Sequence, residues 1–129
     1  MEHTVTSIPG EGIGPEVSRA ARRILDASGA QLKWEEVAAR AEMERRGGGY
    51  LAAEAITSLE RNRYGLKGPM TTPVASGPPS INVGLRKALD LYANLRPVKN
   101  LPGVKSRYEG VDLVIVRENT EDLYSGIEH

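Results

Sequence analysis

The stretch "TVTSIPGEGIGPEV", residues 4–17, carries the pattern that decides the fold. Its first five residues are β-branched or small and apolar, which is typical of a strand, and Pro9 and Gly10 then end that strand in a tight turn. Pro15 suits the first position of a helix because its missing N–H is not needed there. The stretch therefore predicts a strand, a glycine turn and a helix in immediate succession.

The rest of the chain continues to alternate between strand and helix patterns. Residues 31–37, 92–98 and 111–118 favour strands, and the last of these is so apolar that we expect it to be buried on both faces. Helical spacing recurs in three stretches: Val17, Ala21, Ile24, Leu25 and Ser28; Leu51, Ala55, Ile56 and Leu59; Ile81, Leu85 and Leu89. This alternation predicts an α/β architecture.

Composition narrows the classes of function. The 129 residues include 17 basic and 17 acidic ones, so no overall charge favours nucleic acid or an acidic membrane, and any anion site has to be local. The chain has no cysteine, which excludes disulfides and thiolate metal sites. We find no signal-peptide pattern and no apolar run near the roughly 20 residues of a membrane span. We expect a cytoplasmic protein with a small-molecule partner.

The first glycine turn does not match known phosphate loops. Gly10, Gly12 and Gly14 are spaced G-x-G-x-G, whereas the dinucleotide fingerprint requires G-x-G-x-x-G, and the Walker lysine and hydroxyl pair is missing. The residues alone therefore favour a tight structural turn over a ligand loop.

A longer glycine and proline segment, "LKGPMTTPVASGPPSINVGLRK", covers residues 66–87. Its prolines stiffen the backbone while its glycines expose it, so Thr71, Thr72, Ser80 and Asn82 could direct polar groups at a ligand. The alternative is a proline-rich surface connection in which Ser80 is only the N-cap of the next helix. The residues leave these two interpretations open.

Three arginines favour the ligand interpretation. Arg86 follows Ser80, Arg96 lies within a strand pattern, and Arg117 ends the most apolar strand pattern in the chain. A guanidinium group suits bidentate binding of carboxylate or phosphate, and three of them suit a small polyanion. The alternative is that each arginine pairs with a nearby acid, as Glu118 could do for Arg117.

The stretches "IPGEGIGPEV", "LKGPMTTPVASGPPSINVGLRKALDLYANLRPV" and "VDLVIVRENTEDLYSGIEH" together resemble the β-decarboxylating dehydrogenases, the isocitrate/isopropylmalate dehydrogenase family. The similarity runs from Thr4 to His129. The serine, asparagine and arginine of "SINVGLR" follow the pattern of the branch of NAD-dependent isocitrate dehydrogenases, which act in the tricarboxylic acid cycle. Glu11 departs from the family's usual aspartate.

The resemblance implies roles for ten residues. Tyr124 would be the general acid, and Ile13, Lys67, Thr71 and Thr72 would lie along the cofactor. The substrate carboxylates would be held by Ser80, Asn82, Arg86, Arg96 and Arg117. The family's metal-binding aspartates and catalytic lysine have no counterpart in these 129 residues, so no metal ligand is assigned.

The resemblance also implies a fold and an activity. The family fold is α/β without the G-x-G-x-x-G Rossmann fingerprint, and we expect residues 1–92 to begin its large domain and residues 93–129 its small, dimerising domain. The implied reaction is the oxidative decarboxylation of isocitrate to 2-oxoglutarate with NAD, NADP not being excluded, and Mg²⁺ or Mn²⁺ in the complete enzyme. We expect a truncated or short form of the enzyme, inactive by itself.

The alternative is a non-catalytic module, derived from that enzyme, that binds a tricarboxylate, regulates or oligomerises. In either case strands without neighbours would favour pairing with another copy, so we expect a homo-oligomer.

Overall fold

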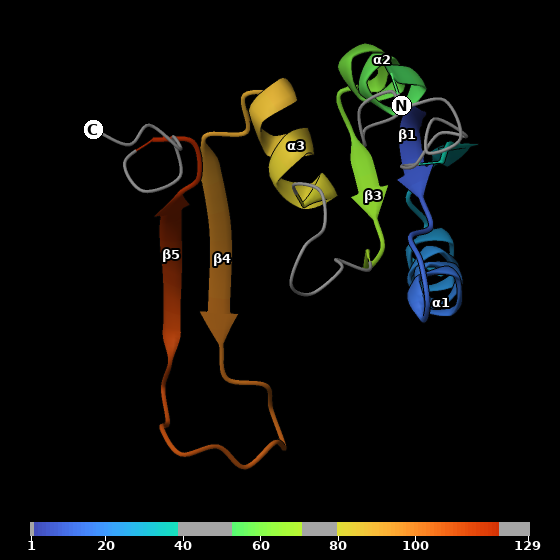
Figure 1. Ribbon diagram of the computed structural model, residues 1–129. Helices are drawn as coiled ribbons and strands as arrows, with labels where there is room; N and C mark the ends of the chain where they lie inside the picture. Colours follow the sequence, from blue (N-terminus) through green and yellow to red (C-terminus); the bar gives the residue numbers. More distant parts are fainter. Residues whose placement is uncertain (1, 39–52, 71–79, 122–129) are drawn as a thin grey trace. The chain divides into compact units, whose positions relative to one another are not determined.

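The computed structural model describes residues 2–38, 53–70 and 80–121. The chain forms two compact units, Met1–Leu89 and Asp90–His129, and most of their helices and strands are labelled in Figure 1. The assignment of residues 1–92 and 93–129 to a large and a small domain stays a prediction, because contacts within this chain do not define the domains of a longer protein.

The first unit is built on a parallel sheet with the strand order β2-β1-β3 (Figure 1). Its strands are β1 (His3–Ile8), β2 (Leu32–Glu36) and β3 (Gly65–Lys67). β1 is central, and its residues 5–8 are all buried, as expected for a parallel strand covered on both faces. The predictions of β1 and β2 are confirmed. β3 was not predicted, because three residues are too few to show an alternating pattern.

Helix α1 (Gly14–Ala27) confirms the predicted helix, and its predicted apolar stripe is only partly turned inward. Ala21 and Leu25 of that stripe are half-buried. Gly14 and Ser18 are buried, whereas Val17 is 47% exposed and Ile24 is 71% exposed. The small side chains at positions 14 and 18 let the helix backbone approach the turn after β1, and bulkier groups would hold it away. The helix ends before Gly29, which has the expected positive φ of 82°.

The core of the first unit includes one face each of α2 (Ala53–Asn62) and α3 (Ile81–Ala88). Most of the predicted positions of both helices are confirmed, but Ile56 is only half-buried and Leu51 lies outside the described residues. The cluster consists of buried Ile8, Val37, Ala55, Ile81 and Leu85, with Leu59, Met70 and Leu89 partly buried against them. None of the described helices is long and apolar enough to span a membrane.

A chain of polar side chains joins β1, β2 and α2 beside this core. The buried hydroxyls of Thr6 and Ser58 lie 2.7 Å apart. The Asn62 side-chain amide donates to the Thr6 hydroxyl and to the Glu35 carboxylate, both at 2.9 Å. Arg61 forms an ion pair with the same carboxylate. The buried hydroxyls are therefore satisfied, as burial requires.

The second unit contains an antiparallel pair of strands, β4 (Ala93–Lys99) and β5 (Asp112–Glu118), with Pro97 opposite Val114. The prediction that the second strand is buried on both faces is wrong, because residues 113–116 are 48–66% exposed. Within the described part of this unit β5 pairs only with β4, and no helix is present to cover either face.

We predict that Asn62→Ala lowers the free energy of unfolding of the first unit by about 1–3 kcal/mol, because a buried hydroxyl and a carboxylate lose their shared donor. The hydrogen bond from Asn62, followed by the one from Arg61, holds the pKa of Glu35 below its ordinary value of 4.5. A lowered carboxyl pKa adds stability above the unfolded pKa, and this stability is lost as the pH falls through the folded pKa. The effect of the substitution should therefore be larger at neutral pH than in acid.

The free energy of unfolding can be measured at neutral and at acid pH by urea titration. The signal is the fluorescence of Trp34, the single tryptophan of the chain and a residue of β2. Thr57→Ala, at an exposed position of the same helix, is the control and should change stability little. An Asn62→Ala effect no larger than that of the control would contradict the prediction.

Candidate functional site

The carboxyl ends of β1 and β3 are joined by two interlocked turns. The backbone N–H of Glu11 donates to the carbonyl oxygen of Pro69 at 2.8 Å, and that of Gly68 donates to the carbonyl of Ile8 at 2.8 Å. This edge is where open α/β sheets bind their ligands. The candidate site is therefore built around these two turns.

Glycines are required here because backbone packs directly on backbone. A Cβ atom at Gly10, whose φ is 88°, would overlap the carbonyl oxygen of Pro69, and one at Gly68 would overlap that of Pro9. A Cβ at Gly14 would lie 2.7 Å from the Pro9 carbonyl oxygen. Neighbouring backbone thus accounts for the glycines at these positions without a ligand, which supports the structural interpretation of the first glycine turn.

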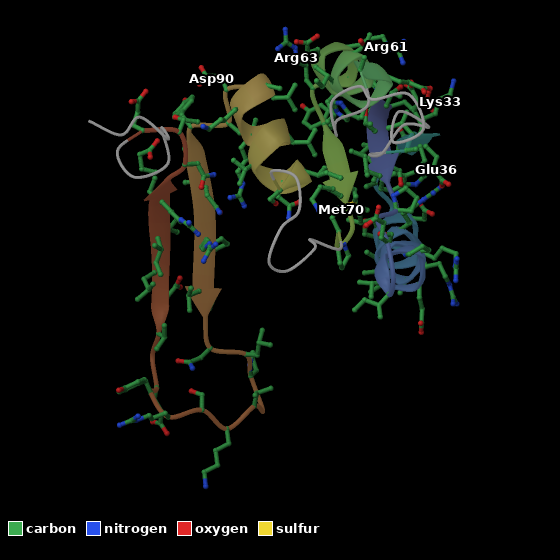
Figure 2. The ribbon with its side chains drawn as sticks, viewed as in Figure 1. Lys33, Glu36, Arg61, Arg63, Met70 and Asp90 are labelled. Atoms are coloured by element: carbon green, nitrogen blue, oxygen red, sulfur yellow. The ribbon has the colours of Figure 1, made fainter. Side chains whose placement is uncertain are left out.

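A partly open cavity of about 370 Å³ lies at the same edge. It is lined by the turn after β1, by the end of β2 and by Met70 beyond β3; Glu36 and Met70 are labelled in Figure 2. Among the described residues, none of those predicted to hold substrate or cofactor lines this cavity. Its walls are Pro9, Gly10, Glu11, Glu36, Val37, Ala38 and Met70.

Two predicted site residues, Lys67 and Arg86, come together within the first unit. Lys67 ends β3 and donates through Nζ to the carbonyl oxygen of Gly68. Partial burial, followed by the nearby charge of Arg86, lowers the pKa of Lys67 from its ordinary value of 10.5. Among the described residues no carboxylate pairs with either cation. The local positive charge is thus left for an anion to offset.

The start of α3 adds polar groups that helix formation does not use. Ser80 occupies the N-cap position, but its hydroxyl makes no capping hydrogen bond. The prediction that Ser80 stands at the N-cap is confirmed, but the prediction that its side chain caps the helix is wrong. The Oδ1 atom of Asn82 is buried without a hydrogen-bond partner, and Asn82 is four residues, about one helical turn, before Arg86. Asn82 therefore lies on the same face of α3 as Arg86, although Arg86 belongs to the last turn of the helix and Asn82 to its first.

Within the second unit, the strand register places Arg96 and Arg117 on one face. Arg117 lies opposite Asn94, and Arg96 lies opposite Ile115. Opposed residues share a face, and so do residues two apart in a strand. The two arginines are therefore diagonal neighbours, a relation in which residues are about 7–8 Å apart.

The remaining predicted site residues are less informative. Ile13 stands at the N-cap of α1 and is 68% exposed; its contact with a cofactor stays a prediction. Thr71, Thr72 and Tyr124 lie outside the described residues. Among those described, no group of three His, Cys, Asp or Glu side chains could hold a metal ion.

Comparison with known proteins decides the family. The model of the isocitrate/isopropylmalate dehydrogenase family matches residues 4–129. The chain belongs to this family. The family fold expected from the sequence, α/β and without the Rossmann fingerprint, is thereby confirmed. A solved relative, the isocitrate dehydrogenase of Methylococcus capsulatus, superposes with a TM-score of 0.84 at 46% identity over 98% of this chain and 38% of its own.

Curated relatives come from both main branches of the family. The alpha subunit of human mitochondrial NAD isocitrate dehydrogenase is 51% identical over 98% of this chain and 34% of its own length. The chloroplastic 3-isopropylmalate dehydrogenase of Solanum tuberosum is 48% identical over 96% of this chain and 35% of its own length. This family member thus spans about a third of the length of the curated relatives that it matches.

Sequence reasoning missed the residues that build the turns and the cavity. Ser18, 5% exposed, donates its hydroxyl to the carbonyl of Pro9 at 2.9 Å, and it was not singled out. Glu36 and Met70 were also overlooked. The positions directly after β1 and β2 could have been found, since the carboxyl ends of parallel strands meet at one edge. Ser18 could not have been found in this way, because a serine within a helix pattern does not indicate a contact with a distant turn.

Proposed function

We propose that the chain carries part of the substrate site of an isocitrate-type β-decarboxylating dehydrogenase, and that it binds a polycarboxylate. The observation that carries the proposal is the pair of cations Lys67 and Arg86, which lie close together with no described carboxylate beside them. Two neighbouring like charges destabilise each other, and a bound carboxylate would offset that repulsion. Ser80 and Asn82 would supply a donor and neutral polar groups beside them.

The second unit supports the same ligand class. Arg96 and Arg117 share one face of the strand pair, a spacing that suits separate carboxylates of one small molecule. Isocitrate is preferred over isopropylmalate because of the "SINVGLR" pattern at residues 80–86. Overall identity does not separate the branches, since relatives of both are about equally similar.

The proposed parent reaction is the oxidative decarboxylation of isocitrate to 2-oxoglutarate. NAD is supported as the hydride acceptor by the names of the mitochondrial relatives. Mg²⁺ or Mn²⁺ is proposed only for the complete enzyme, because the described residues offer no metal-binding group, and no step is assigned to it. We expect this chain by itself to bind the polycarboxylate without turning it over. A cytoplasmic location stays a prediction.

The second candidate is a non-catalytic binding or oligomerising module. The exposed residues 113–116 of β5 favour it, because a flat apolar strand with an open edge tends to pair with another chain. We propose a homo-oligomer on this ground.

The binding proposal predicts that isocitrate, titrated into the chain by calorimetry, binds roughly 10- to 100-fold more weakly to Arg86→Ala than to the unchanged protein, because charge-assisted hydrogen bonds are lost. Arg23→Ala, which removes an exposed cation of α1, is the matched control and should keep full affinity. Equal affinity in the two variants, or no binding to the unchanged chain, would exclude this site.

The lowered pKa of Lys67 predicts a pH dependence. As the pH rises through that pKa, Lys67 loses its proton and one attraction for the ligand disappears, so the affinity for isocitrate should begin to fall over a pH range below the ordinary lysine pKa of 10.5. Lys67→Arg keeps its charge over this range and should bind with little change. The same slope in both proteins would show that Lys67 does not face the anion.

Self-association should depend on the apolar residues of β5. Val114→Lys places a charge on an exposed apolar position of the strand and is expected to shift the protein towards monomer in size-exclusion chromatography with light scattering. Val104→Lys is the matched control, since Val104 is similarly exposed, 62% against 61%, but lies in the connection between β4 and β5. If the unchanged protein is monomeric at all concentrations, the proposal of a homo-oligomer is contradicted.

A further inference from the structure

The carbonyl oxygen of Pro9 lies at a meeting point of three segments. Ser18 of α1 donates its hydroxyl to this oxygen at 2.9 Å, and the Cα of Gly68 is so close that a Cβ there would overlap both the oxygen and the Ser18 hydroxyl. Gly14, at the first turn of α1, approaches the same oxygen. A single hydroxyl therefore fixes the turn after β1, the first turns of α1 and the segment after β3.

These segments carry residues that the proposed function uses. The turn after β1 leads to Ile13 at the N-cap of α1, and the segment after β3 includes Gly68, whose carbonyl accepts from Lys67. On the other side, the N–H of Glu11 is bonded to the carbonyl of Pro69. The two ligand-bearing segments are thus joined by two backbone hydrogen bonds, from Glu11 to Pro69 and from Gly68 to Ile8. They also pack directly on each other at Pro9, whose carbonyl accepts from the Ser18 side chain.

We propose that Ser18 is a positioning residue, whose hydroxyl holds the turn after β1 and the segment after β3 in the register that presents Lys67 to the anion. The proposal rests on the proposed polycarboxylate site. Ser18 itself is 5% exposed and touches no ligand in this scheme. Its effect is on the direction of the Pro9 carbonyl, on which Gly68 packs, because a carbonyl that loses its donor is free to rotate towards another partner.

Two amides report on the register without any ligand. The N–H groups of Glu11 and Gly68 bridge the two segments, bonding to Pro69 and Ile8. The N–H of Val37, bonded to Ser7 at 2.9 Å in the same sheet, does not, and it serves as the internal control. If Ser18 fixes the register, Ser18→Ala should increase hydrogen exchange at Glu11 and Gly68 by roughly fivefold or more relative to Val37.

The Lys67 ammonium gives a second reading. Lys67 is held by the Gly68 carbonyl, is partly buried, and faces the charge of Arg86 on α3. When the segment loosens, Lys67 gains water, so its titration, followed by NMR of the ¹³C-dimethylated protein and assigned with Lys67→Arg, should move up towards its ordinary value in Ser18→Ala. A serine that only packs would lower global stability without moving this titration.

A pair of isosteric variants separates the hydroxyl from the shape of the side chain. Ser18→Thr and Ser18→Val have the same volume, and only threonine can donate to Pro9. Both variants add the same bulk at this buried position, so the difference between them reports the hydroxyl alone. Exchange at Glu11 and Gly68 should be slower, and the Lys67 titration should lie lower, in the threonine variant than in the valine variant. Isocitrate affinity should fall roughly two- to tenfold in the valine and alanine variants alone.

The outcomes are separable. Equal exchange and titration in the threonine and valine variants overturn the positioning role, whether or not isocitrate binds. If these two readings follow the hydroxyl but the unchanged protein does not bind isocitrate, the proposed function fails while the register role stands.

Discussion

The first unit depends on the contact of two backbone turns without side chains between them. The carbonyls of Pro9 and Pro69 each fill the space where a Cβ of the other segment would stand. This contact is possible only with glycine at positions 10 and 68, and it sets the distance between the ends of β1 and β3. Because interiors are close-packed, such a contact leaves the two segments little freedom to slide. Everything at this edge of the sheet takes its position from it.

The same contact explains how a neutral protein can hold an anion site. A chain with 17 basic and 17 acidic residues has no overall field, so the local arrangement must supply one. β3 ends at Lys67 and α3 brings Arg86 near it, while Glu35 and Glu36 pair with Arg61 and Arg22. Cations held apart from acids in the folded state need no rearrangement when an anion arrives.

Sequence reasoning succeeded where a residue's own neighbours along the chain decide its structure. β1, β2 and the inner faces of α2 and α3 follow from alternation or helical spacing. It failed where tertiary contact overrides the local pattern. The apolar stripe of α1 pointed to Val17 and Ile24, yet the small residues Gly14 and Ser18 face inward, because the helix packs on a backbone turn that accepts only small groups.

The two arginine positions on the strand pair show how far local rules reach towards a binding site. Antiparallel register and the two-residue period of a strand suffice to bring Arg96 and Arg117 onto one face, although they are 21 positions apart in sequence. Likewise β3 and α3 bring Lys67 and Arg86 together within the first unit. Each unit thus forms a pair of cations from its own elements. The members of each pair come from different elements, so strand register and packing bring them together, and the residue types in the sequence do not state that pairing.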